Sequence, residues 1–278
     1  MRKHGISETK GDRALTALFY VLLTLFSLLC LYPLALAFSV AFSSEQAVSA
    51  NGFSIIPQQP TLDTFRYLLS QKMNILIQGY GMTIFITLVG TACSLAITLM
   101  YAFAISMPGF RHANKFSFFA YFTMLFNGGM IATYMVVRNL GMFDTRWAVI
   151  LPTCVSAFNL ILVRTSMSTI PAALEESAML DGCGVLRMLF YVVSPMNKSG
   201  LVCVLLLSFL DAWNMVEQPI AYLKSFDQYP ISVALAYAPP TDTTVHLVCC
   251  ILVVLPALFL FTLFNRELVE GIVLAEVK

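Results

Sequence analysis

Long apolar stretches alternate with shorter polar segments along this chain. Six of the stretches approach or exceed the roughly 20 residues that an α-helix needs to cross a lipid bilayer. They comprise residues 14–42, 73–110, 116–137, 147–163, 199–223 and 243–264. Because backbone groups in lipid must form hydrogen bonds within their own segment, each stretch is predicted to be a helix. The pattern therefore predicts an all-α integral membrane protein with six transmembrane helices.

Composition strengthens this prediction. Hydrophobic residues make up 59% of the 278 residues and charged residues only 11%, which is more apolar surface than a soluble fold could hide. The net charge of +1 indicates neither a nucleic-acid partner nor an acidic one. Six of the seven cysteines lie within apolar stretches and none forms a CxxC pair, so we expect buried thiols and no metal site. Residues 14–42 are too long for the apolar core of a signal peptide, so no cleavable signal is expected.

The positions of lysine and arginine predict the orientation of the chain. With a cytoplasmic N-terminus, eleven of the sixteen Lys and Arg residues fall on the cytoplasmic side and five fall outside. This excess favours both termini inside (N-in/C-in). The sequence then predicts a cytoplasmic segment at 1–13 and a single transmembrane domain at 14–278, with a short helix near 61–70. Its long polar connections are the cytoplasmic loop 164–198 and the outer loops 43–72 and 224–242.

The cytoplasmic loop 164–198 has the pattern of two short helices. Ser168 or Thr169 can cap the first helix, and Pro171 fits its first turn, where no N–H is needed. Residues 172–180 that follow are good helix formers. The first helix is therefore predicted at 172–180.

A glycine separates this helix from the next one. Gly182 stands where a helix commonly ends with a left-handed residue, and Asp181 is placed to cap a second helix over 185–193. Pro195 then marks the entry to the fifth span. The loop is expected to form a rigid knob at the membrane surface.

The first loop helix combines an apolar stripe with acidic residues. The stripe comprises Ile170, Leu174 and Ala178, which lie four residues apart. Glu175 and Glu176 fall in mid-helix and must face water or a partner. One interpretation is a helix that rests on lipid headgroups. The helix lacks the face rich in Lys and Arg that a lipid-bound helix carries, which favours a socket on another protein.

The loop also carries a spaced motif. Glu176-Ser177-Ala178-Met179-Leu180-Asp181-Gly182 is followed, after nine residues, by Val192-Val193-Ser194-Pro195. This resembles the EAA loop of ABC importer permeases, in which Glu-Ala-Ala, three residues, Gly, nine residues and Ile-x-Leu-Pro follow one another. The spacing matches throughout, and Ser177, Val192 and Ser194 depart from the pattern. The stretch is most similar to MalG-like, carbohydrate-type permeases.

The resemblance extends over most of the chain. It includes Tyr32-Pro33-Leu34, Phe126-Asn127-Gly128-Gly129-Met130, Asn139-Leu140-Gly141-Met142-Phe143-Asp144-Thr145, Trp213-Asn214 and the tail 268–278. It implies the type I ABC importer (MetI-like) permease fold in a bacterial plasma (inner) membrane. It also implies that residues 170–182 form a coupling helix seated in a cleft of an ATPase subunit. The residues implied for this coupling are Ile170, Leu174, Glu175, Glu176, Ser177, Ala178, Asp181, Gly182 and Pro195.

The same resemblance implies partners and cargo. The chain would form half of a translocation pathway, together with a second homologous permease subunit. Two ATPase subunits would bind ATP and magnesium, so no cofactor is expected on this chain. An extracytoplasmic solute-binding protein would deliver a carbohydrate, more specifically an oligosaccharide.

Polar side chains inside the apolar stretches are candidates for the lining of such a pathway, because ionisable groups in a span usually face the bundle interior. Sugar hydroxyls that leave water need replacement hydrogen bonds, which such side chains supply. Asp211, Asn214, Gln218 and Tyr222 recur at steps of three and four residues and are expected to share one helix face. The full set of candidates is Asn127, Ser156, Asn159, Asp211, Trp213, Asn214, Gln218 and Tyr222. The alternative is that these residues only join helices to one another or to a second subunit.

Two other functions remain open at this point. A membrane enzyme would need Asp211 and Glu217 as acid and base, but they are six residues apart, on different helix faces, and no nucleophile or metal set supports them. No GxxxxGK(S/T), HExxH or GxSxG motif occurs, so neither ATP hydrolysis nor a catalytic site is expected on this chain. An energy-independent channel or transporter would leave the paired helices of 164–198 unexplained.

Overall fold

The chain is helical throughout the part that the structure describes. This computed structural model describes residues 10–71, 73–107, 109–237 and 243–276. Within these ranges the β-type pairing is limited to one isolated antiparallel bridge between Ser43 and Pro60. The predicted all-α class is therefore confirmed for the described chain.

The described chain divides into two compact units. The first contains Met1–Gln71 and Pro240–Leu252, and the second contains Lys72–Pro239 and Val253–Lys278. The predicted single domain over 14–278 stays a prediction. Part of the predicted cytoplasmic segment lies outside the described residues, as do four charges used for the orientation: Arg2, Lys3, Lys72 and Lys278.

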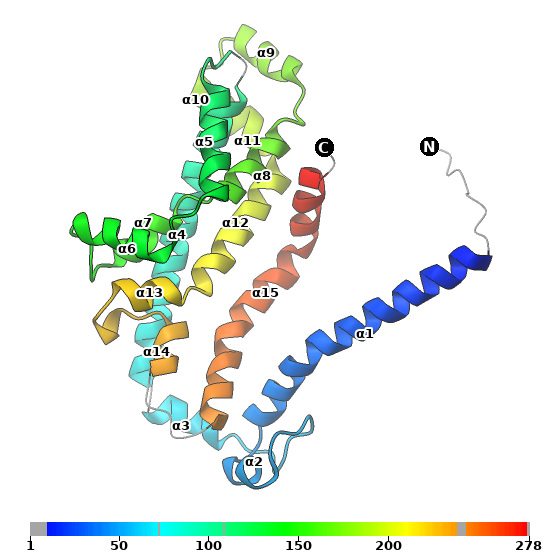
Figure 1. Ribbon diagram of the computed structural model, residues 1–278, viewed down its shortest axis with the longest axis vertical. Helices are drawn as coiled ribbons and strands as arrows, with labels where there is room; N and C mark the ends of the chain where they lie inside the picture. Colours follow the sequence, from blue (N-terminus) through cyan, green and yellow to red (C-terminus); the bar gives the residue numbers. More distant parts are fainter. Residues whose placement is uncertain (1–9, 72, 108, 238–242, 277–278) are drawn as a thin grey trace. The chain divides into compact units, whose positions relative to one another are not determined.

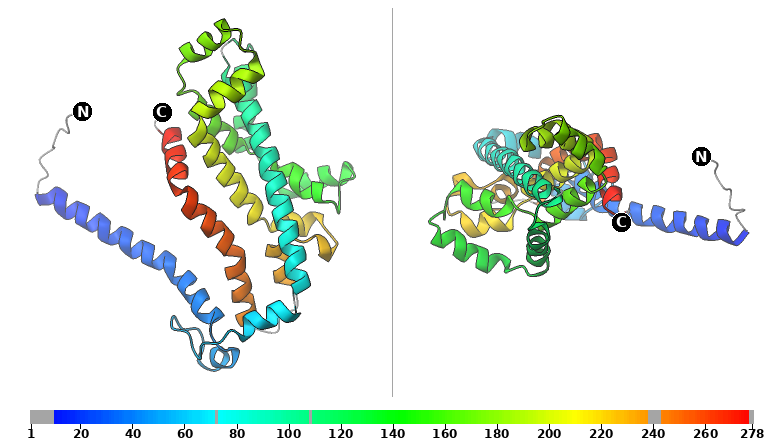
Figure 2. Two further views of the ribbon diagram at one scale, coloured as in Figure 1. Left: turned by 180° about the vertical axis from the view of Figure 1, so that it is seen from behind. Right: turned by 90° about the horizontal axis from the view of Figure 1, so that it is seen from above.

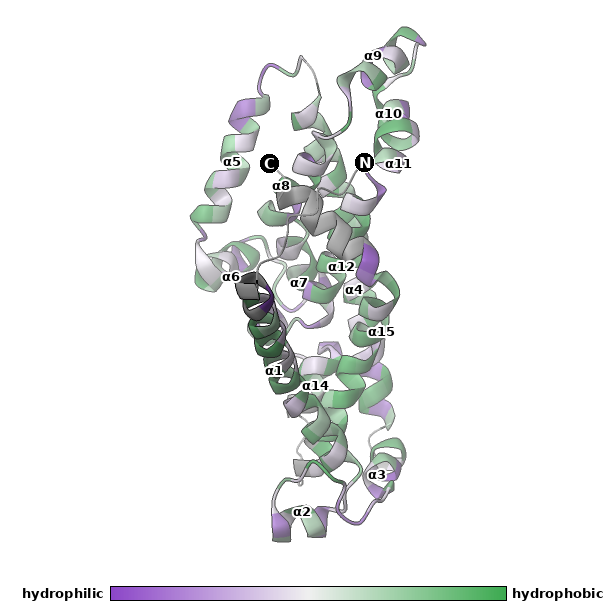
Figure 3. Cartoon of the chain, turned by 90° about the vertical axis from the view of Figure 1, so that its right-hand side faces the viewer, coloured by the Kyte–Doolittle hydropathy of each residue, from purple (hydrophilic) through white to green (hydrophobic). Residues whose placement is uncertain are grey.

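The first unit combines one long apolar helix with two short ones. Its elements are α1 (Lys10–Ala41), α2 (Glu45–Asn51), α3 (Asp63–Gln71) and the beginning of α15 (Thr243–Glu276). The hydroxyl of Ser44 caps α2 by accepting a hydrogen bond from the Ala47 N–H at 3.3 Å. The helix α3 matches the short helix expected near 61–70. The most apolar part of α1 is 0% buried within the chain, and Figure 3 shows its hydrophobic colour.

The second unit is centred on three helices that lie side by side in the views of Figures 1 and 2. They are α4 (Met73–Ser106), α8 (Ala157–Met167) and α12 (Lys198–Trp213). Their contact buries an apolar core that includes Phe103, Val163 and Cys203. In a membrane such a core is stabilised by van der Waals packing rather than by removal of apolar surface from water.

The helix α4 also carries a row of buried hydroxyl groups. They belong to Thr83, Thr87, Thr91, Ser94 and Thr98, which recur every three or four residues. The Ser94 Oγ lies 3.2 Å from the Ser208 Oγ, which also accepts a hydrogen bond from the Asn159 Nδ2 at 3.0 Å. Polar contacts thus join all three central helices.

The span predicted at 116–137 is not one helix. It divides into α5 (Ala113–Leu125) and α6 (Gly129–Asn139), which are bent by 115° relative to each other. Gly129 has a φ of +76°, and its N–H donates to the Asn127 Oδ1 at 2.9 Å. A left-handed glycine held by an asparagine side chain starts the new helix direction.

The span predicted at 147–163 also breaks. It divides into α7 (Arg146–Thr153) and α8, with a bend of 41°. Ser156 lies in extended backbone before α8, and its hydroxyl accepts a hydrogen bond from the Asn159 N–H at 3.3 Å. The serine therefore acts as a helix N-cap inside an apolar stretch.

The span predicted at 199–223 ends early, because α12 stops at Trp213 and a short helix α13 (Glu217–Tyr222) follows. In a continuous helix Pro219 could not donate to the Met215 carbonyl, and its ring would clash with that carbonyl. The Ser232 Oγ donates to the Met215 oxygen instead, at 2.9 Å. Proline thus explains the break.

The structure leaves the number of spans open. Three helices of the described chain are long and apolar enough to cross a membrane: Leu15–Ala41, Met73–Ser106 and Leu247–Arg266. The count rises to six if each of three bent pairs is one span, the last pair being Val185–Met196 with Lys198–Trp213. The six spans and the orientation therefore stay predictions. The outer loop predicted at 224–242 contains η2 (Phe226–Gln228) and α14 (Ile231–Tyr237).

Candidate functional site

The loop 164–198 contains the predicted first helix with the predicted bounds, α9 (Ala172–Leu180). Its capping differs from the prediction, because Pro171 is the residue before the helix and makes no side-chain cap. The hydroxyls of Ser168 and Thr169 donate instead to the carbonyls of Thr165 and Ser166, both at 2.7 Å. These two residues therefore finish α8, and the prediction that one of them caps α9 was wrong.

The turn after α9 is built around Gly182, as predicted. Gly182 has a φ of +76°, its N–H donates to the Met179 carbonyl at 3.0 Å, and the Cys183 N–H donates to the Ala178 carbonyl at 2.9 Å. These bonds close the end of α9. Asp181 is the C-cap of α9 and does not cap the next helix, which begins after Gly184 without a side-chain cap.

The second loop helix runs further than predicted. It consists of α10 (Val185–Met188), a π-helical turn (Leu189–Val193) and α11 (Ser194–Met196). Pro195 lies inside α11, and the chain bends by 88° between Met196 and Lys198. The entry to α12 is therefore at Asn197 and not at Pro195, because proline at the start of a helical turn loses no hydrogen bond.

The predicted apolar stripe of α9 faces two ways. Ile170 and Ala178 pack against the core formed by α4, α8 and α12, whereas Leu174 is 41% exposed. Glu176 is exposed, but Glu175 is buried, and its burial raises the pKa of the carboxyl group. The expectation that both glutamates face water or a partner was therefore wrong for Glu175, which is buried within this chain.

The outer surface of this loop holds the remaining predicted residues. Leu174, Glu176, Ser177, Asp181, Gly182 and Pro195 are all exposed. Leu180 and Leu186 are also exposed, by 89% and 67%, and pattern reasoning had singled out neither. Little in the sequence indicates that these leucines are exposed, since an apolar residue in a helical loop is normally assigned to the core. Together they give the outer surface an apolar part as well as an acidic one.

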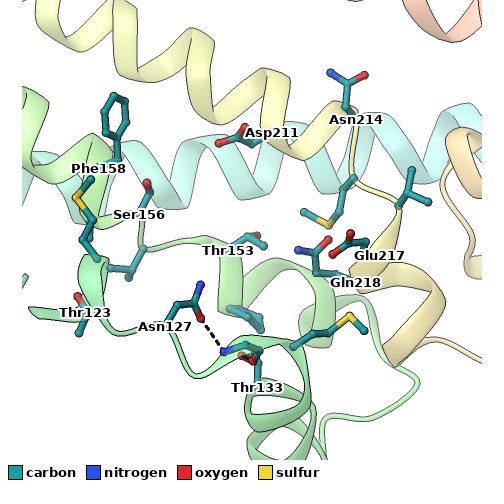
Figure 4. Close-up of a pocket in the computed structure, with 18 of the residues that line it drawn as sticks. Thr123, Asn127, Thr133, Thr153, Ser156, Phe158, Asp211, Asn214, Glu217 and Gln218 are labelled. Carbon is teal, nitrogen blue, oxygen red and sulfur yellow. Dashed lines mark hydrogen bonds between the residues drawn. The ribbon is translucent and has the colours of Figure 1, made fainter.

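A second candidate site is a hollow of about 1130 Å³ in the second unit. Figure 4 shows side chains from α5, α6, α7, α12 and α13 gathered around it. Its described lining is Phe119, Thr123, Met124, Asn127, Gly129, Met130, Thr133, Pro152, Thr153, Val155, Ser156, Ala157, Phe158, Leu210, Asp211, Asn214, Met215, Val216, Glu217, Gln218 and Tyr222. Hydroxyl, amide and carboxylate groups thus share the lining with aromatic rings.

Three of the breaks between helices meet at this hollow, whereas the bend at Asn197 does not. Residues 127 and 129 at the break between α5 and α6, 155 and 156 between α7 and α8, and 214–216 between α12 and α13 belong to its lining. Non-helical backbone is tolerated at membrane depth only where protein covers it or where it borders a water-filled cavity. The convergence therefore favours a hydrated hollow within the apolar helices.

Most of the predicted lining residues lie in the hollow. Asn127, Ser156, Asp211, Asn214, Gln218 and Tyr222 come together there from four segments of the chain. Asp211, Asn214, Gln218 and Tyr222 do not share one continuous helix face, because α12 ends before Asn214. They converge because α13 turns toward the same hollow.

Two predicted residues lie elsewhere. Trp213 is 5% exposed, its Nε1 donates to the Val253 carbonyl at 2.9 Å, and its ring stacks on Phe209. Asn159 is 2% exposed and donates to Ser208. Both residues join helices, which was the alternative interpretation. The hollow contains instead hydroxyls that pattern reasoning did not select, those of Thr123, Thr133 and Thr153.

The carboxylate of Asp144 positions the end of α13. Its Oδ1 accepts hydrogen bonds from the N–H groups of Lys224 at 2.8 Å and Ser225 at 3.3 Å, while its own N–H donates to the Tyr222 carbonyl at 2.9 Å. The backbone hydrogen bond from Lys224 is the main cause that lowers the pKa of Asp144 below the ordinary value of 3.8. The connection between α6 and α7 is thereby tied to the helix that carries Glu217 and Gln218.

Replacing Asp144 with Asn is expected to lower the melting temperature of the purified protein at neutral pH, because a neutral amide oxygen accepts these hydrogen bonds more weakly. The stabilisation by the carboxylate is present above the ordinary pKa and is lost as the pH falls through the lower folded pKa. Melting curves should show a wild-type advantage that is constant near pH 7 and shrinks below about pH 4. Asp227→Asn, at an exposed position of η2, is the control. An advantage that persists undiminished at about pH 3 would contradict this role.

No metal site is evident in the described part of the chain, where no three His, Cys, Asp or Glu side chains gather suitably. No protein-family model matches the sequence. Individual relatives do match it over nearly its whole length.

Two curated relatives come from Bacillus subtilis strain 168. The polygalacturonan/rhamnogalacturonan transport system permease protein YtcP is 30% identical over 96% of this chain and 99% of its own length. Protein LplC is 27% identical over 99% of this chain and 98% of its own. The arabinooligosaccharides transport system permease protein AraQ of Halalkalibacterium halodurans is 24% identical over 90% of this chain and 92% of its own.

A solved structure shares the fold. It is a chain of a bacterial ABC transporter involved in the import of the acidic polysaccharide alginate, with a TM-score of 0.83 and 29% sequence identity. The match covers 93% of this chain and 98% of the solved one. The arrangement of helices around the hollow is thus shared with a transport protein.

Proposed function

The chain belongs to the permease subunits of sugar ABC transport systems, and on this premise we propose that it forms half of a pathway that imports an oligosaccharide. It is a membrane protein and a transport subunit. The observation that carries the proposal is the hollow of about 1130 Å³, lined by hydroxyl, amide and carboxylate groups where three broken helices meet. Such groups replace the hydrogen bonds that sugar hydroxyls lose on leaving water.

The names of the relatives support a carbohydrate but leave its charge open. One relative is named for polygalacturonan and rhamnogalacturonan, another for arabinooligosaccharides, and the solved transporter for an acidic polysaccharide. An oligosaccharide substrate agrees with all of these names. It also agrees with the hollow, which has room for more than one sugar ring.

Energy would enter through the outer surface of loop 164–198. In the proposal, α9 is the coupling helix, and an ATPase subunit that binds ATP and magnesium contacts Leu174, Glu176 and Ser177. The exposure of these residues supports this, as does the packing of Ile170 and Ala178 on the core, which would transmit force to α4, α8 and α12. Glu175, buried beside them, would hold α9 in place.

The remaining partners complete the importer. A second homologous permease would supply the other half of the pathway, and a second ATPase subunit would serve that permease. The orientation in the proposal has both termini in the cytoplasm and six spans, so that 43–72 and 224–242 face outwards toward a solute-binding protein. The apolar surface of α1, unburied within its own unit, would face lipid or the second permease.

Charge reversal at Glu176 tests the coupling. In the importer reconstituted with its ATPase subunits and binding protein, Glu176→Lys should reduce ATP-driven uptake at least about tenfold, since an unfavourable charge in a docked interface costs more than 1.4 kcal/mol. The ATPase subunits should also co-purify less with this variant. Glu176→Gln, which keeps the shape without the charge, should retain more uptake.

Three outcomes would count against the proposal. Full ATP-driven uptake by Glu176→Lys would remove the coupling role from this surface. Uptake that needs no ATP would indicate an energy-independent channel. A chain that is active without any ATPase subunit would contradict the importer itself.

A further inference from the structure

The hollow carries negative charge only. Asp211 at the end of α12 and Glu217 at the start of α13 are both exposed to it, and Figure 4 shows them on the same side as Asn214 and Gln218. Among the described residues of its lining, none is Lys, Arg or His. The negative charge of the two carboxylates is therefore not balanced by the residues of this lining, which we call the wall.

Two of the cations near this region are held by aromatic rings outside the hollow. Arg146, which begins α7, places its guanidinium 5.3 Å from the centre of the Phe85 ring. Lys224, which follows α13, places its Nζ 5.1 Å from the centre of the Phe143 ring. Both contacts have cation–π geometry, and neither residue belongs to the lining. The wall is thus without a positive group where an anionic sugar would need one.

We propose that this wall selects uncharged oligosaccharides and excludes chains of uronic acids, an inference that rests on the function proposed above. The Asp211 and Glu217 carboxylates accept hydrogen bonds from neutral sugar hydroxyls, and charge-assisted bonds of this kind are the stronger ones. The rings of Phe119 and Phe158, 61% and 53% exposed, offer apolar faces to the C–H side of a pyranose.

A uronate carboxylate would meet the same groups unfavourably. It donates no hydrogen bond when ionised, and like charges a few ångströms apart repel strongly where protein limits the access of water. Neutral donors such as the Asn127 amide nitrogen, whose Oδ1 partner is bonded to the Gly129 N–H, remain in the lining, but they carry no positive charge to balance two carboxylates. Similarity to a transporter of an acidic polysaccharide is therefore no evidence that this wall accepts an anion.

The test uses the complete importer reconstituted in liposomes with its ATPase subunits and binding protein. Uptake of galactotetraose is compared with uptake of tetragalacturonate, which has the same number of pyranose rings. The decisive quantity is the change in the ratio of neutral to anionic uptake between wild type and the variants. In Asp211→Asn with Glu217→Gln, the ratio should fall several-fold, and Glu217→Gln alone should lower it in part.

Asp227→Asn is the matched control. It removes one carboxylate outside the hollow and should leave the ratio of neutral to anionic uptake unchanged. Because the same binding protein serves every variant, its own preference cancels from the comparison.

Each remaining outcome has one meaning. A ratio of neutral to anionic uptake that rises in the double variant would overturn the inference and leave the proposed importer intact. A ratio unchanged in the double variant would overturn it too, since selection would then lie outside this wall. ATP-driven uptake of neither sugar would contradict the proposed oligosaccharide import, and this inference with it.

Discussion

A valine in place of Gly182 is expected to abolish ATP-driven uptake while the chain still reaches the membrane. Gly182 has a φ of +76°, which costs an L-residue roughly 1–2 kcal/mol, and a β-branched residue more. Relief of this strain would break the bonds from Gly182 to Met179 and from Cys183 to Ala178, which close the end of α9. Since 1.4 kcal/mol is a factor of ten, the proposed coupling arrangement would be populated about tenfold less or worse.

Gly184→Val is the matched control for this experiment. Gly184 has a φ of −70° and a ψ of 157°, which valine adopts readily, and a Cβ there would meet no atom within 4 Å. Uptake by reconstituted importer and the amount of chain in isolated membranes are measured for both variants. Equal loss in the two would assign the effect to added bulk on the loop, whereas normal uptake by Gly182→Val would show that α9 needs no defined end.

Gly200→Ala is expected to lower the stability of the helix packing by about 1–3 kcal/mol, the usual cost of overpacking. A Cβ at Gly200 would lie 2.6 Å from the Ser166 Oγ, 2.7 Å from the Asn197 Oδ1 and 2.9 Å from the Ser166 Cβ. The Ser166 hydroxyl donates to that asparagine oxygen, and both residues are 3% exposed. The methyl group would therefore push α8 away from the beginning of α12 and strain a buried hydrogen bond.

Thermal melting of the purified chain in detergent measures this effect. Gly81→Ala is the control, because Gly81 is an exposed helical position of α4 where an added Cβ meets no atom within 4 Å. There the change should be neutral or stabilising by up to about 1 kcal/mol, since alanine is the better helix former. Equal melting temperatures for Gly200→Ala and wild type would mean that the contact relaxes without cost.

The loop was largely predictable because its signals are local. A proline, a run of helix formers and a glycine at Gly182 specify α9 and its end from neighbouring residues alone. The capping of α9 was not predictable in this way, because the hydroxyls of Ser168 and Thr169 could bond either the N–H groups that begin α9 or the carbonyls that end α8. In the structure they bond the carbonyls. The choice between these partners depends on where α8 ends, and the position of α8 is determined by its packing against α4.

The broken spans show where hydropathy fails. Averaged over 18 residues, the stretches around Asn127 and Ser156 remain apolar enough to span a membrane, so the breaks vanish from the hydropathy profile. The residues that cause them are single polar, glycine or proline positions such as Gly129 and Pro219. Neither residue was identified as a helix break from the sequence, and only the fold shows where these helices end.

The sequence correctly predicted that polar side chains line the hollow, but it did not predict the full set of lining residues. Spacing placed Asp211 and Gln218 on one side of an uninterrupted helix, but side-chain chemistry alone could not exclude Trp213 and Asn159 from the candidates. Those two side chains are buried by partners far away in the sequence, Val253 and Ser208. Long-range packing of this kind decides which polar groups meet a substrate and which join helices.

The convergence of three helix breaks on one hollow has a consequence for mutational mapping. At a break, peptide N–H and C=O groups have no hydrogen-bond partner within a helix and become available to a bound substrate. Such groups are present whatever the side chain, so alanine scanning of positions such as Val155 or Val216 would miss any contact that they make. Side-chain mutagenesis should therefore detect fewer contacts in this lining than the backbone actually makes. Specificity could then diverge between related chains through a few carboxylates while the peptide framework that receives a sugar stays the same.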